Sequence, residues 1–458
     1  MNDMLAESGA HSLVPGGRRR HRMARQSGTG VRRAIVLALA LPVTSAALAA
    51  PSAFAAEGGI GATAEGVTAG RTPGADDQRM IADLEARVLD PRLGPQVSGV
   101  VLDSASDTTL WDHNGATALM PASNTKLATA TAALTVLGAD HRFTTKAVYG
   151  DGTLTLVGGG DRTLTGADLA ALAKTAVAGL EEAAGVTSVK VAVDDSLFAE
   201  PALADGWNTG YYPDSVAPVR ALVVDGHAVQ DTAIDAGQAF GRELAAAGVT
   251  VDGAVTRAQA RPGDVPVARH RSAPLSEIVH KMIKVSDNDI AETLLRMTAL
   301  GAGRPATFEG GTEVVRQVLS YRYGVSLDHF EIHDGSGLSR ANRIPAATLA
   351  EILELLTESR YSATLGSLLD GLPVSGEAGS TLGPEWGRFD DVNSSCAVGK
   401  VRAKTGTLTG AVALSGLTQG KDGRWKVFSF VENNSTAAPN DIKDAMDGLA
   451  ATVNGCWA

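Results

Sequence analysis

Three short polar motifs, far apart along the chain, constrain its fold more than any other feature. They read Ser-Asn-Thr-Lys at residues 123–126, Ser-Asp-Asn at 286–288 and Lys-Thr-Gly-Thr at 404–407, and each occurs once. The first begins an alanine-rich stretch typical of a helix, the second lies between two helical patterns, and the third lies in a strand pattern. The chain is therefore expected to form an α/β domain that uses helices and strands together.

The first motif places a lysine one helical turn after a serine. Residues three apart share one face of a helix, so the Lys126 amine should lie beside the Ser123 hydroxyl. A serine is a weak nucleophile unless a base accepts its proton, and a lysine can serve if burial and a nearby cation lower its pKa. Alone, the motif is more often a solvated helix start. Together with the other two motifs, it makes Ser123 the candidate nucleophile and Lys126 the candidate base.

The second motif has a simple structural interpretation as well as a functional one. Ser, Asp and Asn all favour the N-cap of a helix, and a lone Ser-Asp-Asn tripeptide is usually such a cap. The functional interpretation makes Ser286 a proton relay and Asn288 an amide that contacts substrate.

The third motif lies on a predicted strand, where a lysine usually protects a sheet edge. The functional interpretation has Lys404, Thr405 and Thr407 bind a substrate carboxylate. Gly406 would then let the substrate backbone approach closely. The amides of Thr407 and Ser123 would form an oxyanion hole.

The three motifs together favour the functional interpretations, because this set is found in class A β-lactamases and penicillin-binding proteins. Longer runs make the chain resemble one group, the low-molecular-mass class C penicillin-binding proteins, or D-Ala-D-Ala carboxypeptidase/endopeptidase family. The runs that carry the resemblance are residues 121–126, 156–161, 217–222, 286–292, 334–340 and 402–408.

The resemblance implies an α/β fold: a serine β-lactamase/penicillin-binding-protein-like catalytic domain with an antiparallel sheet and helices, interrupted by an inserted α/β region. It implies action on peptidoglycan stem peptides through an acyl-serine, and acylation by β-lactams. No cofactor is expected. The roles carried over match those above, with Ser123, Lys126 and Ser286 catalytic. Two departures are an insert that looks short and an unusual run at residues 372–379, which predicts a different substrate preference there.

These patterns predict a chain divided into segments. They are a signal peptide (1–55), a linker (56–75), a first catalytic part (76–145), an inserted domain (146–270) and a second catalytic part (271–458). Helices are expected at 76–89, 121–137, 167–180, 232–247, 275–285, 290–300, 311–321, 345–358 and 441–453. Strands are expected at 97–102, 109–111, 148–157, 189–193, 219–224, 249–255, 400–408, 412–419 and 425–432. The last three should form an antiparallel meander that the first two complete.

The beginning of the chain has the features of an export signal. An arginine cluster precedes an apolar run at residues 34–50, and Ala53-Phe54-Ala55 fits a cleavage site. The protein is therefore expected outside the cytoplasm, secreted or associated with the cell wall. A retained membrane anchor is the alternative, although Pro42 interrupts a run that is short for a span. Met23 is a possible true start.

Charge and cysteine content exclude some partners. The net charge of −11 argues against nucleic acid, and the nine histidines lack the His-Glu-x-x-His spacing of a zinc site. Cys396 and Cys456 are the two cysteines, and an exported location favours a disulfide between them. Two buried free thiols are the alternative.

Two other functions remain open. A class A β-lactamase would also form an acyl-serine, but its deacylating glutamate should stand in a Glu-x-x-Leu-Asn run, which this chain lacks. A non-catalytic wall-binding protein would be expected to have lost Ser123 or Lys404. The sequence does not separate carboxypeptidase from endopeptidase action, because both cut beside a D-alanine.

Overall fold

The computed structural model describes residues 72–456. The expected signal peptide, its cleavage after Ala55, the alternative anchor, the start at Met23 and most of the linker lie outside these residues. Within the described part, no helix is both long and apolar enough to cross a bilayer.

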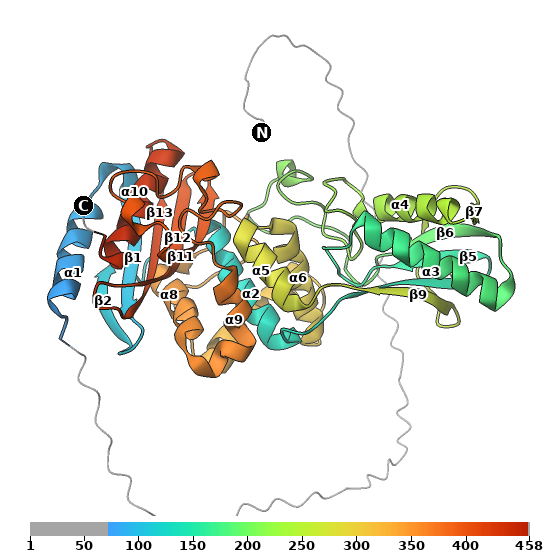
Figure 1. Ribbon diagram of the computed structural model, residues 1–458, viewed down its shortest axis with the longest axis horizontal. Helices are drawn as coiled ribbons and strands as arrows, with labels where there is room; N and C mark the ends of the chain where they lie inside the picture. The colour runs from blue at the N-terminus through green and yellow to red at the C-terminus, as the bar shows by residue number, and fades with distance from the viewer. Residues whose placement is uncertain (1–71, 457–458) are drawn as a thin grey trace, which may run out of the picture. The chain divides into compact units, whose positions relative to one another are not determined.

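The first sheet has five antiparallel strands in the order β11-β12-β13-β1-β2 (Figure 1). Their bounds are Gln96–Asp103 for β1, Thr108–His113 for β2, Val401–Leu408 for β11, Ala411–Gln419 for β12 and Trp425–Asn433 for β13. The N-terminal hairpin therefore completes the C-terminal meander, as the sequence predicts.

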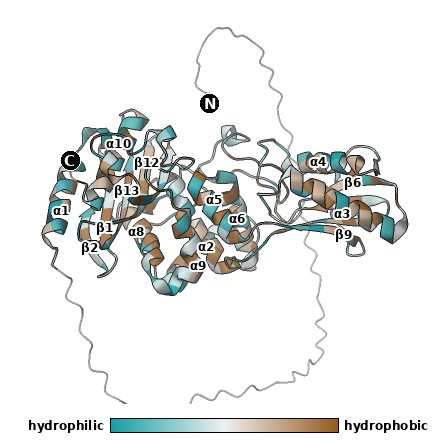
Figure 2. Cartoon of the chain, in the orientation of Figure 1, coloured by the Kyte–Doolittle hydropathy of each residue, from teal (hydrophilic) through white to brown (hydrophobic). Residues whose placement is uncertain are grey.

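Helices cover both faces of this sheet, which explains why β12 and β13 read as nearly continuous apolar runs. Successive strand residues point to opposite faces. Along β13, Phe428 and Phe430 pack in one apolar cluster with residues of α1 (Ala75–Arg87) and α10 (Pro439–Asn454). Val427 and Val431, which flank this pair and point the other way, pack in a second cluster on the other face. Helix α1 is mainly hydrophilic in Figure 2, and Met80 and Leu84 contribute to the first cluster.

The second cluster is a group of helices around α2. Nearly all of α2 is buried, and its Ala and Thr side chains allow neighbouring helices to approach closely. The helices of this group are α2 (Thr125–Leu137), α5 (Leu275–Val285), α6 (Asn288–Gly301), α7 (Phe308–Gln317), α8 (Ala346–Glu354) and α9 (Ser362–Gly371). Helix α9 was not predicted, because its short sequence contains two glycines and resembles a connecting loop.

A second sheet lies between the first and second motifs of the sequence. Its strand order is β7-β6-β5-β4-β9, with β8 also beside β6, and α3 (Gly166–Ala184) and α4 (Thr232–Ala246) share its apolar core. The bounds are Thr144–Gly150 for β4, Thr153–Val157 for β5, Ser188–Asp194 for β6, Thr250–Val251 for β7, Thr256–Arg257 for β8 and Val265–Arg271 for β9. The predicted domain limits at 146 and 270 stay a prediction.

Three strand predictions in this region were wrong. The single strand expected over 148–157 is the hairpin β4–β5, which turns at Asp151 and Gly152, both with positive φ. The segment 219–224 is buried but forms no strand, and the segment 249–255 contributes only the short β7. Buried apolar runs of this length do not distinguish a strand from a buried connection, which explains these errors.

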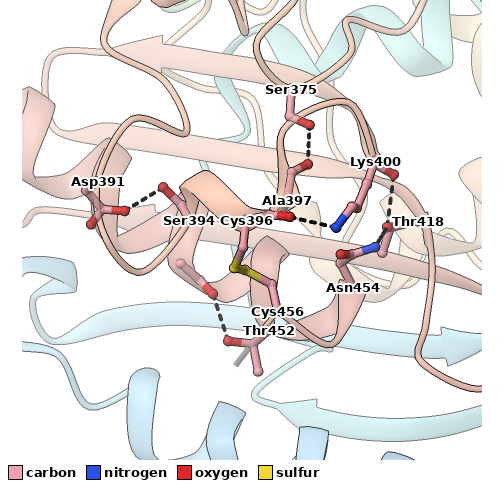
Figure 3. Close-up of a disulfide and its surroundings, with 11 residues drawn as sticks. Ser375, Asp391, Ser394, Cys396, Ala397, Lys400, Thr418, Thr452, Asn454 and Cys456 are labelled. Atoms are coloured by element: carbon pink, nitrogen blue, oxygen red, sulfur yellow. Dashed lines mark hydrogen bonds between the residues drawn. A yellow bond between two sulfur atoms is a disulfide. The ribbon is translucent and has the colours of Figure 1, made fainter. Parts of the chain in front are cut away.

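The Cys396–Cys456 disulfide is present, as predicted (Figure 3). It joins a turn before β11 to the residues just after α10, with the two Cα atoms 5.8 Å apart. The Asn454 amide donates to Thr418 Oγ1 at 2.9 Å nearby, so the chain end is held to β12 as well.

Candidate active site

Ser123 lies in a 3-10 turn, Ala122–Asn124, that leads directly into α2. The sequence predicts a helix from Pro121, but the α-helix begins at Thr125. The turn is strained, because Ala122 has a φ of +48°. This geometry leaves Ser123 half-buried, while its neighbours Ala122 and Asn124 are buried.

Lys126 is fully buried and contacts three acceptors. Its Nζ lies 3.0 Å from Ser123 Oγ, 2.7 Å from Asn288 Oδ1 and 2.7 Å from the Ser336 carbonyl oxygen. The amide and carbonyl oxygens can only accept, whereas a hydroxyl can also donate. A neutral amine has two N–H groups and one lone pair, so donation to Asn288 and Ser336 leaves the lone pair for the Ser123 hydroxyl.

Burial lowers the pKa of Lys126 to about 8, although the nearby carboxylates of Asp334 and Glu292 oppose the shift. The neutral amine is therefore accessible near neutral pH. Burial is the main cause of this shift, rather than a nearby cation.

The three residues of the second motif have different contacts. Asp287 caps α6, because its side chain accepts from the Ile290 amide, so the N-cap interpretation applies to Asp287 alone. Ser286 ends α5 with a φ of +61° and accepts from Lys404 Nζ at 2.9 Å. The Asn288 amide nitrogen donates to the Ser215 carbonyl at 2.8 Å while its oxygen accepts from Lys126.

Asp289, which follows the motif, was not predicted as part of the site. It accepts from the Ala217 amide at 2.8 Å and pairs with Arg162 at 2.9 Å. Together with the Asn288–Ser215 bond, these contacts tie the start of α6 to residues of the 144–271 region.

The third motif lies on β11, with Lys404 fully buried. Lys404 Nζ donates to Ser286 Oγ and to the Thr405 carbonyl at 2.7 Å. Burial lowers its pKa well below the usual range, and the charges of Lys126 and Arg388 lower it further. An anion beside Lys404, such as the substrate carboxylate that the sequence predicts there, would favour its charged form. Thr407 is exposed, and Thr405 Oγ1 donates to Thr381 Oγ1 at 2.7 Å.

Two glycines set the position of the Ser123 turn. A Cβ on Gly406 would lie 2.8 Å from the Pro121 carbonyl oxygen and 3.2 Å from the Ser123 amide nitrogen. A Cβ on Gly337 would lie 1.9 Å from the Ala122 carbonyl oxygen. Gly406 therefore allows β11 to approach the turn closely. The sequence predicted a close approach of the substrate at this glycine and not of the Ser123 turn.

A cleft of about 280 Å³ opens over Ser123. The residues that line it are Ser123, Val285, Ser286, Thr381, Trp386, Arg388, Thr405, Thr407 and Lys443. The hydroxyl groups of all three motifs thus meet at one opening, with Lys126 and Lys404 buried behind them. A larger cavity of about 360 Å³ elsewhere is lined by carboxylates and contains no residue of the motifs.

A buried loop at residues 334–340 supports this arrangement. Glu292 accepts from the Gly335 and Ser336 amides at 3.0 and 2.7 Å, which fixes the carbonyl that Lys126 contacts. Asp334 accepts from the Ser339 amide at 2.6 Å and from the Trp207 indole at 2.8 Å. Glu292 lies in the run 286–292, but no periodicity relates it to this loop, because Gly335 and Ser336 are more than forty positions away.

Metal ligands are not grouped in the described part of the chain. Residues 72–456 contain no set of three His, Cys, Asp or Glu side chains that could hold an ion.

Comparison with known proteins shows clear relatives over most of the chain. The carboxypeptidase DacB of Mycolicibacterium smegmatis is 33% identical over 395 residues, which cover 81% of this chain and 83% of the relative. A D-alanyl-D-alanine carboxypeptidase of Actinomadura sp. is 30% identical over 466 residues, covering 80% of this chain and 83% of the relative.

A solved structure shares the fold. Penicillin binding protein 4 (dacB) from Haemophilus influenzae superposes with a TM-score of 0.68 at 24% identity, covering 82% of this chain and 98% of that one. This likeness confirms the predicted fold class. The sequence profile of the D-Ala-D-Ala carboxypeptidase 3 (S13) family matches residues 80–228 and 225–453. The chain belongs to this family of D-Ala-D-Ala carboxypeptidases.

Proposed function

We propose that this protein is a serine-type D-Ala-D-Ala carboxypeptidase or endopeptidase that acts on peptidoglycan stem peptides through an acyl-enzyme at Ser123. The observation that carries the proposal is the 3.0 Å contact between Lys126 Nζ and Ser123 Oγ, with the other two partners of the amine both obligate acceptors. Family membership supports the same reaction.

In the acylation step, Ser123 Oγ attacks the carbonyl carbon of the penultimate D-alanine while Lys126 takes the hydroxyl proton. The amides of Ser123 and Thr407 stabilise the oxyanion. Collapse breaks the C–N bond and leaves an ester on Ser123. Ser286 gives its hydroxyl proton to the leaving nitrogen, which is possible because its oxygen accepts from Lys404. The proton that Lys126 took from Ser123 then replaces it, so both side chains are neutral again before deacylation.

In the deacylation step, water attacks the ester carbonyl, and the C–O bond to Ser123 breaks. Lys126 takes a proton from the water and returns one to Ser123 Oγ. The products are a shortened stem peptide and the regenerated enzyme. The same steps release free D-alanine from an uncrosslinked peptide or a second stem peptide from a crosslink.

The terminal carboxylate of the substrate is assigned to the hydroxyls of Thr405 and Thr407, with Lys404 supplying positive charge from behind them. Gly406 between them keeps β11 close to the Ser123 turn. A bound carboxylate opposes the burial that lowers the Lys404 pKa and so favours its charged form.

The decisive experiment is incubation with purified muropeptides, with Ser123→Ala as the control. Release of free D-alanine identifies a carboxypeptidase, and conversion of dimers to monomers identifies an endopeptidase. If the unmodified enzyme gave neither product, the proposed reaction would be wrong.

β-Lactams should acylate the same serine. A labelled penicillin is expected to remain on Ser123 for minutes or longer, because no second base for deacylation was found in the sequence. Intact-protein mass spectrometry tests this. Rapid turnover of the drug would indicate the alternative, a β-lactamase, and absence of any adduct would favour a non-catalytic wall-binding protein.

We also propose that the protein is exported and acts at the cell wall or as a secreted enzyme. The basic and apolar leader with Ala53-Phe54-Ala55 supports this, as does membership of a cell-wall peptidase family. N-terminal sequencing of the mature protein is the test. A chain that still carried residues 34–50 would indicate an anchor.

A further inference from the structure

The cleft over Ser123 is lined by more than the groups that the proposed reaction requires. Besides the hydroxyls of the three motifs, its wall contains Arg388 and Lys443, and no acidic residue is among its lining side chains. These two cations come from the segment before β11 and from α10, which are outside all three motifs. The charge of Arg388 acts both on Lys404 of the third motif and on Lys443. The proposed function places the carboxylate of the leaving group at that motif.

Arg388 is held rigidly in this wall. The side chain is 4% exposed, and its Nε and Nη2 donate to the buried Asp447 carboxylate at 2.9 and 2.5 Å. The third guanidinium nitrogen, Nη1, donates to no described residue, although Arg388 lines the cleft. A pre-positioned donor of this kind loses little conformational entropy when it binds an anion.

Lys443 is the second cation. Its Nζ donates to Asn440 Oδ1 at 3.3 Å, and it forms no ion pair with another described residue. Burial and the charge of Arg388 lower its pKa, while Asp447 and Asp444 oppose the shift. Arg388 also lowers the pKa of Lys404, so its charge acts on both the motif lysine and Lys443. An anion bound among these groups would relieve their mutual repulsion.

The cleft also has an apolar surface beside these cations. Trp386 is 56% exposed and Val285 is 47% exposed, and both line the opening. A free D-alanine leaving group has one carboxylate and a methyl group, so it would leave this surface uncovered. An aliphatic chain that ends in a second carboxylate matches both the apolar wall and the cations.

We propose that Arg388 and Lys443 form a second anion subsite on the leaving-group side of the cleft, which selects leaving groups that carry an aliphatic arm with a further carboxylate. The proposal rests on the proposed function, because that function fixes which side receives the leaving group. Such a leaving group is a branch of a crosslinked peptide rather than free alanine. The subsite therefore favours cleavage of crosslinks.

The test uses acyl-D-alanyl peptides whose leaving groups are D-2-aminoadipate and D-2-aminopimelate, each compared with its ω-amide. The paired leaving groups differ by one negative charge and have the same length. We expect kcat/KM to be about tenfold or more higher for at least one ω-carboxylate than for its amide, as a charge-assisted contact implies. Lys443→Gln should lower this ratio of kcat/KM values toward one, because only Arg388 remains to bind the ω-carboxylate, and Lys443→Arg should preserve it.

Lys421→Gln is the matched control, because Lys421 is an exposed lysine in the turn between β12 and β13. The ratio of kcat/KM for the ω-carboxylate to kcat/KM for the ω-amide should be the same in this variant as in the unmodified enzyme. A ratio near one in the unmodified enzyme would overturn the subsite, and so would a Lys443→Gln enzyme with lower rates but an unchanged ratio. Failure of the proposed function would look different, since neither D-alanine release nor penicillin labelling of Ser123 would be seen.

Discussion

At the scale of single residues, the site depends on two lysines that are both fully buried but have different partners. Lys126 contacts Ser123 Oγ and two obligate acceptors, whereas Lys404 contacts Ser286 Oγ and a strand carbonyl. One arrangement suits a proton acceptor, and the other suits a source of positive charge behind hydroxyl groups. Substitution of the two lysines should therefore have different consequences.

Lys126→Ala is expected to slow acylation by both peptide and penicillin by about 10²–10⁴-fold, the usual contribution of a general base. Lys404→Ala should weaken both reactions by about 1.5–3 kcal/mol, the value of a charge-assisted contact. It should affect a carboxylate-free ester less. Acylation rates of each variant on acidic and neutral substrates provide the measurement. The two roles would be assigned wrongly if the Lys126→Ala enzyme were acylated at a near-normal rate while the Lys404→Ala enzyme lost acylation by every substrate.

The pH dependence of acylation should report the pKa of Lys126. Below a pKa of about 8 the amine is protonated and cannot accept the Ser123 proton, so the acylation rate should rise with pH and level off above that value. Stopped-flow acylation by a chromogenic β-lactam between about pH 6 and pH 10 would show this limb. A rate that fell with rising pH across this range would mean that the charged amine is the active form.

At the scale of secondary-structure elements, the site depends on how closely β11 approaches the 3-10 turn before α2. Gly406 allows this approach, and the position of the Ser123 amide depends on it. The oxyanion assignment requires the Ser123 and Thr407 amides to keep a fixed separation, since a misplaced donor loses most of its effect.

Gly406→Ala is accordingly expected to lower the acylation rate by about 10²–10³-fold, the cost of losing one oxyanion-hole donor. Gly366→Ala in α9 is the control, because a Cβ there meets nothing within 4 Å and alanine favours a helix. Circular dichroism should show that both variants fold. If Gly406→Ala acylated normally, the close approach would not be required for the oxyanion hole.

The sequence predicted the local part of this arrangement and missed the long-range part. Ser123 and Lys126 could be paired because helical spacing relates them, and the meander could be predicted from its apolar runs. The Ser336 carbonyl that completes the Lys126 environment lies 210 positions away, and no periodicity connects the two. The segment 219–224 was misread for a related reason, since burial without strand pairing leaves the same apolar pattern.

At the scale of the whole molecule, distant parts of the chain are held together by covalent and ionic contacts. Lys426 on β13 is buried and donates to Asp77 of α1, Asp103 of β1 and Asp422. The Cys396–Cys456 disulfide fixes the end of the chain to the segment before β11. These contacts stabilise the first sheet and the helices that cover it.

Replacing both cysteines with serine should reduce the free energy of unfolding by about 4 kcal/mol in the chain-entropy model, because the bond closes a 60-residue separation. Chemical denaturation of the variant and the unmodified enzyme measures the difference. Reductant should destabilise the unmodified enzyme and leave the variant unchanged. Equal stability of the two proteins would mean that the unfolded chain gains little freedom when the bond is removed.

The pairing of Thr144 on β4 with Arg271 on β9 also bears on how this protein can change over evolution. The chain leaves for the second sheet and returns from it at adjacent positions, so strands and helices there can be gained or shortened without separating the two ends. The segment with Ser215 and Ala217 is different, because it holds Asn288 and Asp289 in place. Length variation among homologues should therefore accumulate around β7 and β8, and selection should preserve the residues near 215.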